Sequence, residues 1–140
     1  MKTTKIRQQS LASQKGAAMV ELSLCFMLIF SLIYGIFEFS RVVYSYTVLA
    51  GATREASRYA VVHGSQSGSP ATNSDIRTQV ERWGIGLDTS ALTVDTTWPT
   101  GNARGATVSI VTSYTVNPIT TLIMPSPITL RSRSEMVISQ

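Results

Sequence analysis

The chain has few of the residues on which catalytic and metal sites depend. It contains a single cysteine, Cys25, and a single histidine, His63. One cysteine excludes an intramolecular disulfide and every zinc site built from several cysteines, and one histidine excludes paired-histidine zinc motifs. The acidic residues are spread singly along the chain, and no glycine-rich phosphate loop occurs. We therefore expect neither an enzyme nor a protein that binds a cofactor or a metal.

Charged residues are also scarce, at 14% of the chain against about 25% in an average soluble domain. The net charge of +4 comes entirely from the first fifteen residues, which carry no acid. These basic residues are Lys2, Lys5, Arg7 and Lys15. From Gly16 onward, arginines and acids balance, so the sequence predicts no basic surface for nucleic acid.

An uncharged apolar run follows this basic leader. Residues 22–37 read LSLCFMLIFSLIYGIF, and residues 17–21 extend the run with one acid, Glu21. A helix over residues 17–37 would be about 31 Å long, close to the hydrocarbon thickness of a bilayer. We therefore expect a single membrane span. The positive-inside rule places its N-terminus in the cytoplasm and residues 64–140 on the opposite side.

Other interpretations of this run fit the sequence less well. A cleavable secretory signal should be cut close to its apolar run, but the only Ala-x-Ala, at residues 50–52, lies well beyond Phe37. A lipoprotein signal would use Cys25, but the bulky Leu24 precedes it and the apolar run continues after it. A plain uncleaved anchor stays open, although it gives no reason for Glu21.

Glu21 is the unusual residue of the span. A carboxylate near the bilayer edge costs a few kcal/mol unless it is paired. Cleavage after Gly16 would free the amine of Ala17, four residues before Glu21, as a cationic partner in the same chain or in a neighbour. The pattern indicates processing between Gly16 and Ala17, which would remove residues 1–16 as a leader, and it makes Glu21 a candidate for pairing with that amine.

The helix is expected to continue to residue 63, because no proline interrupts residues 17–62. Beyond the span, residues 38–63 carry an apolar stripe at helical spacing. The stripe consists of Phe39, Val42, Tyr46, Leu49, Thr53, Ala56 and Ala60. It would pack on the chain's own C-terminal domain or on a partner helix, or on both at different heights, and the pattern does not choose between them.

The pattern of residues 64–140 predicts a small α+β domain. A loop over 64–74 is followed by a short helix, with Ser74 as its N-cap and Ile76, Val80 and Trp83 on one face. Alternating segments at 91–98, 106–116 and 128–139 predict a three-stranded antiparallel sheet whose apolar face lies on the long helix. The loop at Leu122–Met124 would be either a contact patch or part of the core.

Residues 16–62 resemble the TadE-like family of tight-adherence (Flp-type) pilus assembly. Gly16 with Glu21 carries this resemblance, together with two later blocks. The later blocks contain Glu38, Arg41, Arg54, Glu55, Arg58 and Tyr59. Without the family, Glu55 and Arg58 would form an ordinary ion pair one helical turn apart.

The resemblance implies that Glu21 is an assembly residue. It also implies a pseudopilin whose residues 1–16 are a prepilin-like leader, cleaved between Gly16 and Ala17 by a prepilin peptidase. Its other partners would be pilins or pseudopilins and the assembly platform of the bacterial inner membrane, with residues 64–140 in the periplasm. Whether the protein would end in the filament, at its tip or only in the platform is left open. The alternative function is an uncleaved single-pass anchor that presents a small binding domain.

Overall fold

The computed structural model describes the backbone of residues 3–120 and 124–139, with side chains from Lys15 onward within these ranges. Lys2, the side chains of Lys5 and Arg7, and Leu122 with Ile123 lie outside this description. The chain divides into two compact units, Met1–Phe39 and Ser40–Gln140.

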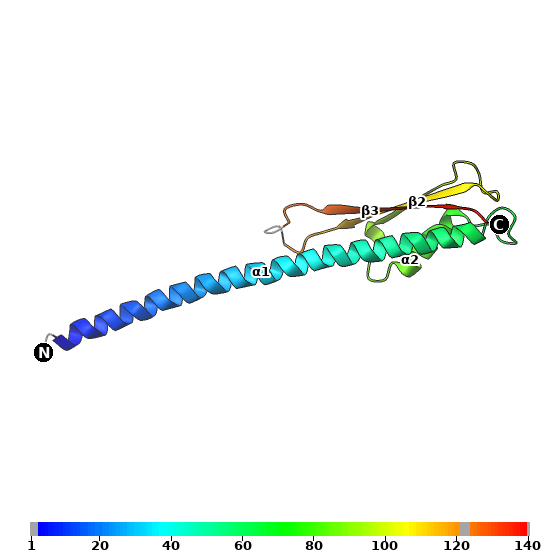
Figure 1. Ribbon diagram of the computed structural model, residues 1–140. Helices are drawn as coiled ribbons and strands as arrows, with labels where there is room; N and C mark the ends of the chain where they lie inside the picture. Colours follow the sequence, from blue (N-terminus) through cyan, green and yellow to red (C-terminus); the bar gives the residue numbers. More distant parts are fainter. Residues whose placement is uncertain (1–2, 121–123, 140) are drawn as a thin grey trace. The chain divides into compact units, whose positions relative to one another are not determined.

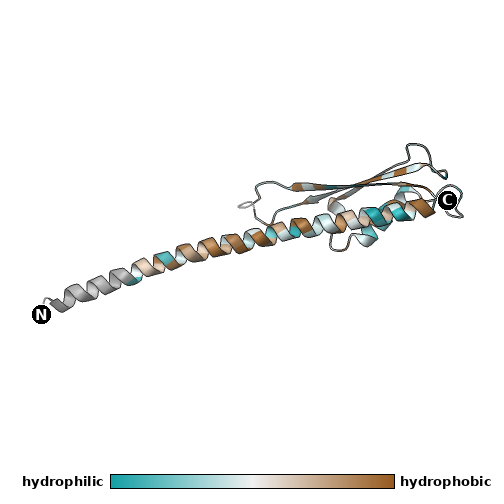
Figure 2. Ribbon diagram, viewed as in Figure 1, coloured by the Kyte–Doolittle hydropathy of each residue, from teal (hydrophilic) through white to brown (hydrophobic). Residues whose placement is uncertain are grey.

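Helix α1 spans Thr3–Val62 and accounts for all the described residues of the first unit (Figure 1). It begins well before residue 17, where the helix was expected to start. The leader contains neither proline nor glycine between Thr3 and Lys15, so nothing in it breaks a helix. The helix ends one residue before the predicted end. Figure 2 shows hydrophobic residues dominating the stretch of α1 that follows the leader.

Helix α2 spans Asn73–Trp83 and begins with a capping box. The Thr72 hydroxyl accepts from the backbone N–H of Asp75, and the Asp75 carboxylate accepts from the backbone N–H of Thr72 at 2.9 Å. The predicted N-cap, Ser74, was therefore wrong by two residues, because the Thr-x-x-Asp spacing satisfies two backbone groups at once. Ile76 and Val80 are buried as predicted, whereas Trp83 is 50% exposed.

A three-stranded antiparallel sheet completes the second unit, with strand order β1-β2-β3. A short 3₁₀ turn, η1 (Thr89–Ala91), leads into β1 (Leu92–Thr97), and β2 (Thr107–Val116) and β3 (Ile128–Val137) follow. Val94 is opposite Thr112 across β1 and β2, and Val108 is opposite Met136 across β2 and β3. The predicted fold class, a long helix with a short helix and this sheet, is confirmed.

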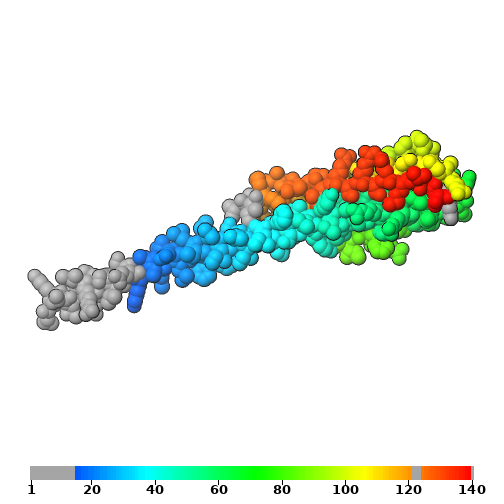
Figure 3. All heavy atoms as spheres, in the orientation of Figure 1, coloured from blue at the N-terminus to red at the C-terminus, as the bar shows by residue number. Residues whose placement is uncertain are grey.

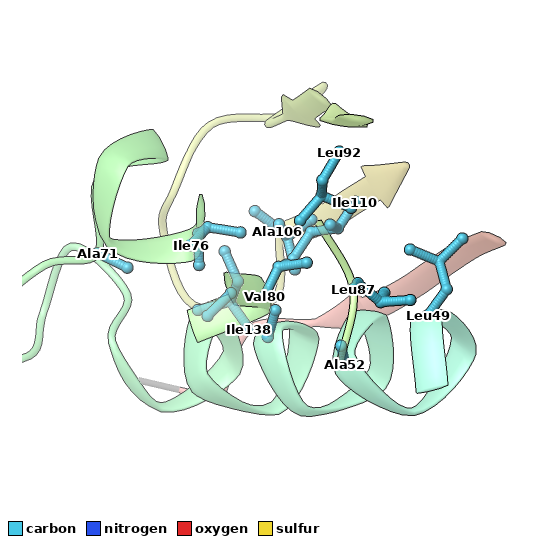
Figure 4. Close-up of a cluster of buried hydrophobic side chains, with 13 residues drawn as sticks. Leu49, Ala52, Ala71, Ile76, Val80, Leu87, Leu92, Ala106, Ile110 and Ile138 are labelled. Atoms are coloured by element: carbon cyan, nitrogen blue, oxygen red, sulfur yellow. The ribbon is translucent and has the colours of Figure 1, made fainter. Parts of the chain in front are cut away.

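The core of the second unit lies between α1, α2 and the inner face of the sheet (Figure 4). Leu49 and Ala56 of α1, Ile76 of α2 and Ile110 of β2 are fully buried. One polar contact crosses the same interface, where the hydroxyl oxygens of Thr53 and Thr112 are 2.6 Å apart. The small side chains of α1 allow the sheet to approach its backbone closely.

The apolar stripe predicted on α1 is buried only in its second half. Leu49, Thr53, Ala56 and Ala60 are buried against the chain's own domain, but Phe39 is 70% and Tyr46 51% exposed. The chain's own domain therefore covers the second half of the stripe, and the interpretation that a partner helix covers the first half stays a prediction. Ser45 is buried instead, because it lies one turn before Leu49 on the row that faces the sheet.

Candidate functional site: the apolar helix and the family-motif residues

The predicted processing bond lies inside a regular helix. Gly16 and Ala17 are exposed residues of α1. A Cβ atom built on Gly16 would meet no atom within 4 Å. Neither a turn nor a close packing contact therefore explains why glycine stands at this position.

Glu21 follows Ala17 by four residues and is exposed on the same helix. Residues four apart lie on one face of a helix, about 6 Å apart along its axis. In the uncleaved chain the nitrogen of Ala17 is an amide, so the cationic partner inferred from the sequence exists only after cleavage. The structure thus places both residues where a new N-terminal amine and the Glu21 carboxylate would share one face.

The apolar run keeps its side chains exposed in the described part of the chain. Apart from the half-buried Tyr34, its large side chains are all at least half exposed, from 50% at Ile29 to 74% at Met27. The most apolar window of 18 residues has a mean hydropathy of 2.2, and none of it is buried. Figure 3 shows the atoms of this run as a narrow column of spheres, coloured blue to cyan. A helix that is apolar all round needs an apolar environment, and by length and composition this one is able to cross a membrane.

The two family-motif residues just after the run are more buried than charged residues on an ordinary amphipathic helix. Glu38 is only 1% exposed, and Arg41 is half-buried. Both were selected from the sequence only through the resemblance. Burial of a carboxylate is unusual, and in the sequence Glu38 is simply the first acid after the span.

The later motif block forms local contacts on the surface of α1. The carboxylate of Glu55 lies 3.5 Å from the Arg58 guanidinium, one turn away, which confirms the predicted ion pair. The Tyr59 ring stacks on the His63 ring with centroids 3.9 Å apart, and His63 Nδ1 lies 2.8 Å from the Tyr59 carbonyl oxygen. Arg54 is exposed. These contacts stabilise the end of the helix, and they do not assemble a nucleophile with a base.

The predicted site residues are divided between the two units. Gly16, Ala17 and Glu21 belong to the first unit, and the block from Arg54 to Tyr59 belongs to the second. Within the described residues no group of three histidine, cysteine or acidic side chains is placed to hold a metal ion.

An apolar groove of about 400 Å³ in the second unit was not predicted from the sequence. Tyr44, Gly51, Trp83 and Ile85 are among its lining residues. The signal that would have indicated it is the segment Trp83-Gly84-Ile85-Gly86, which places two large apolar residues in a glycine turn.

The model of the family described as TadE-like protein matches residues 16–58. No curated protein and no solved structure matched the chain. The matched segment starts at Gly16 and contains the apolar run, Glu21 and the motif residues up to Arg58. Residues 16–58 are therefore a TadE-like segment, which confirms the resemblance inferred from the sequence.

Proposed function

We propose that the chain is a pseudopilin-like structural or assembly component of a bacterial tight-adherence pilus or its secretion machinery, cleaved after Gly16. The observation that carries this proposal is where the family match starts. It begins at Gly16, at the junction between the basic leader and a helix whose large apolar side chains are exposed. The TadE-like family suggests a pilus-related component, and it is a family of structural proteins rather than enzymes.

The environment of Gly16 supports a processing role. Glycine in a helix interior costs about 1 kcal/mol relative to alanine. The chain bears this cost at a position where a side chain would have open space. A binding site outside the chain explains the glycine, because a peptidase cleft that closes around the backbone admits no side chain there.

The proposed organisation follows from the cleavage. Residues 1–16 are the leader, residues 17–63 are the mature helix, and residues 64–140 are the periplasmic domain. The span over residues 17–37 crosses the inner membrane once, with the leader in the cytoplasm. The proposed partners are a prepilin peptidase, other pilins or pseudopilins, and the assembly platform.

Glu21 would act after cleavage. The new amine of Ala17 is a cation at the membrane edge, one turn from the Glu21 carboxylate. In a neighbouring chain the same two groups would face one another only at one relative height of the helices. The pair would therefore set the register between subunits, and its strength would come from the low dielectric of the bilayer edge.

Intact mass tests the cleavage directly. We expect the full chain from membranes of cells with a prepilin peptidase to be lighter by about 1.8 kDa, the mass of residues 1–16, than the chain from cells without it. Edman sequencing of the lighter form should begin at Ala17. Equal masses in the two strains would support the uncleaved anchor instead.

A further inference from the structure

Within the second unit, one row of residues on α1 lines the apolar groove, and it is called the groove row. Its members are spaced by four, three and four residues, so they lie on one face of the helix. They are Tyr44, Val48, Gly51 and Glu55. Trp83, the last residue of α2, and Ile85 line the same groove and are 50% and 69% exposed. The groove row therefore runs from an aromatic ring past a glycine to a carboxylate.

Gly51 is not explained by any contact within the chain. It lies in the interior of α1, where glycine is less favourable than alanine. A Cβ atom built on Gly51 would meet no atom within 4 Å, so nothing in the second unit excludes a side chain there. The glycine leaves the middle of the groove open, and another polypeptide can approach the helix backbone closely at this point.

A second row on α1 precedes the groove row by one residue at every position. Its members are Val43, Thr47, Ala50 and Arg54. One residue turns a helix by about 100°, so the two rows lie on different faces. Val43, Thr47 and Arg54 are exposed and Ala50 is half-buried, so the chain's own domain does not cover this face.

The two rows are complementary position by position. Each begins with an apolar side chain, has its smallest residue in third place and ends in a charge. The charges are opposite, because the groove row ends in Glu55 and the second row in Arg54. Consider two parallel copies in which the groove row of one lies against the second row of the other, shifted by one residue. Gly51 then meets Ala50 of the other copy, and Glu55 meets its Arg54.

The charges also select the orientation of the two helices. In an antiparallel pair with Gly51 against Ala50, Glu55 would lie four residues above the contact and Arg54 four residues below it. At about 1.5 Å per residue they would be about 12 Å apart along the helix axis, too far to pair. Only the parallel arrangement brings the small residues and the opposite charges together.

We propose that the groove row of one copy of the chain binds the second row of a second copy, with their α1 helices parallel. The contact specifies a partner for the proposed assembly role and rests on that role. A second copy is the partner because one chain carries both complementary faces. Glu55 can accept from this Arg54 while it keeps its own Arg58 at 3.5 Å, because a carboxylate has two acceptor oxygens. Since the two faces differ, further copies can add in the same way.

Disulfide cross-linking tests the centre of this contact. In a Cys25→Ser background, one full-length copy carries Ala50→Cys and a differently tagged copy carries Gly51→Cys. Both are expressed in cells with a prepilin peptidase, and the isolated membranes are mildly oxidised. We expect a linked dimer from cells with both copies, and about fivefold less from cells with either one alone, because neither face meets itself. Arg77→Cys, on the exposed surface of α2, replaces Ala50→Cys in the control and should give no dimer with Gly51→Cys.

Charge reversal in the same cross-linking pair tests the orientation. Arg54→Glu should lower the yield of linked dimer about threefold, because it would face Glu55 of the other copy. Arg54→Glu combined with Glu55→Arg should restore the yield, because both members of the pair are exchanged. A yield that stays low in the double variant would overturn the parallel arrangement.

The remaining outcomes separate this inference from the proposed function. Equal yields from mixed and single-variant cells would overturn the contact. So would the absence of a dimer both from this pair and from Arg54→Cys with Glu55→Cys, about one turn further along α1. Intact mass of the same membranes reports the cleavage independently. A processed chain without a dimer would overturn the inference alone, whereas a chain that keeps its leader would contradict the proposed function whatever the yield of dimer.

Discussion

At the scale of single residues, Gly16 gives the sharpest prediction. Gly16→Leu should retain the leader, because its side chain has room in the free helix but not in a peptidase cleft. The helix content should be unchanged or higher, since leucine is a better helix former than glycine. Intact mass and circular dichroism of the full chain check both points. Ala12→Leu, which alters the leader away from the bond, is the control and should be processed normally. Normal processing of Gly16→Leu would contradict the prediction.

Variants of Glu21 test membrane insertion and pilus assembly separately. Glu21→Ala removes a carboxylate that costs a few kcal/mol at the bilayer edge when unpaired, so the chain should insert at least as well as the native protein. It should be processed, remain in the inner membrane and lose pilus-dependent adherence. Glu21→Asp, one methylene shorter, should be intermediate. The measurements are membrane fractionation, intact mass and an adherence assay. Normal adherence at a normal protein level would show that Glu21 has no part in assembly.

Some residues were predictable one by one, and others were not. The Glu55–Arg58 pair follows from helical spacing alone and is present at 3.5 Å. The burial of Glu38 and the exposure of Trp83 do not follow from spacing, because both depend on which neighbours cover a face. Trp83 continues the face of Ile76 and Val80, but it stands at the last turn of α2, where the core ends.

At the scale of elements, the buried small residues of α1 set how closely the sheet approaches. Ala56 is fully buried, so Ala56→Leu should destabilise the second unit by about 1–3 kcal/mol through overpacking. Arg54→Leu, which adds leucine to an exposed position of the same helix, is the matched control and should change the stability little. Thermal unfolding of the full chain in detergent, followed by near-ultraviolet circular dichroism, measures both. Equal effects would show that Ala56 does not limit the packing.

The capping box of α2 gives a second prediction at this scale. Thr72→Ala removes the side-chain acceptor of the Asp75 backbone N–H. It should lower the free energy of unfolding by about 1 kcal/mol. Ser74→Ala is the comparison and should cost less, because Ser74 is inside the helix and its hydroxyl contacts the Thr72 hydroxyl, at 2.7 Å, rather than serving as the cap. Chemical unfolding of the full chain in detergent compares the two. A larger loss of stability in Ser74→Ala than in Thr72→Ala would show that Ser74 is the N-cap, as expected from the sequence.

The same box predicts a pH dependence. Two hydrogen bonds lower the pKa of the Asp75 carboxyl. The bond from the Thr72 hydroxyl has the larger effect, and the bond from the Thr72 backbone N–H comes next. A carboxyl whose pKa is lower in the folded state stabilises the fold above its unfolded pKa. That contribution is lost as the pH falls through the folded pKa, so it should decline below about pH 4. Asp75→Asn should show less of this acid-dependent loss than the native chain when unfolding is followed from about pH 6 to about pH 3.

Element types were predictable because two periodicities alternate clearly along the chain. Helical spacing in α1 and strict alternation in β2 each identify an element without any tertiary information. The boundaries and caps of these elements were less predictable. Thr72 and Ser74 are both good N-caps, and only the reciprocal bond with Asp75 decides between them. Likewise Ser45 and Tyr46 are adjacent on α1, and the position of the sheet determines which one is buried.

At the scale of the whole molecule, topology is the testable property. With Lys2, Lys5, Arg7 and Lys15 held in the cytoplasm, the residues after the span should lie outside it. A reporter that is active only in the periplasm, fused after Gln140, should be active. The same reporter inserted after Met1 should be silent and serves as the control. Activity of a cytoplasm-only reporter after Gln140 would reverse the orientation.

The apolar helix and the small α+β domain are both predictable from the sequence, because each depends on composition and pattern within one segment. The apolar groove of the second unit is not predictable in this way. Tyr44 and Trp83 lie far apart in the sequence, and only the packing of the segment after α2 against α1 brings them together.

The continuity of α1 through Gly16 and Ala17 has a consequence for the proposed cleavage. A protease site that takes its substrate in extended form cannot accept an intact helical turn. The last turn of the leader would therefore have to unwind before the chain could enter the peptidase. Glycine lowers the work of that unwinding by about 1 kcal/mol relative to alanine, because it gains the most conformational freedom when a helix melts. In the proposed cleavage, Gly16 would be both the residue that fits the cleft and the point at which the helix opens most easily, and cleavage should depend on how often this turn is unwound.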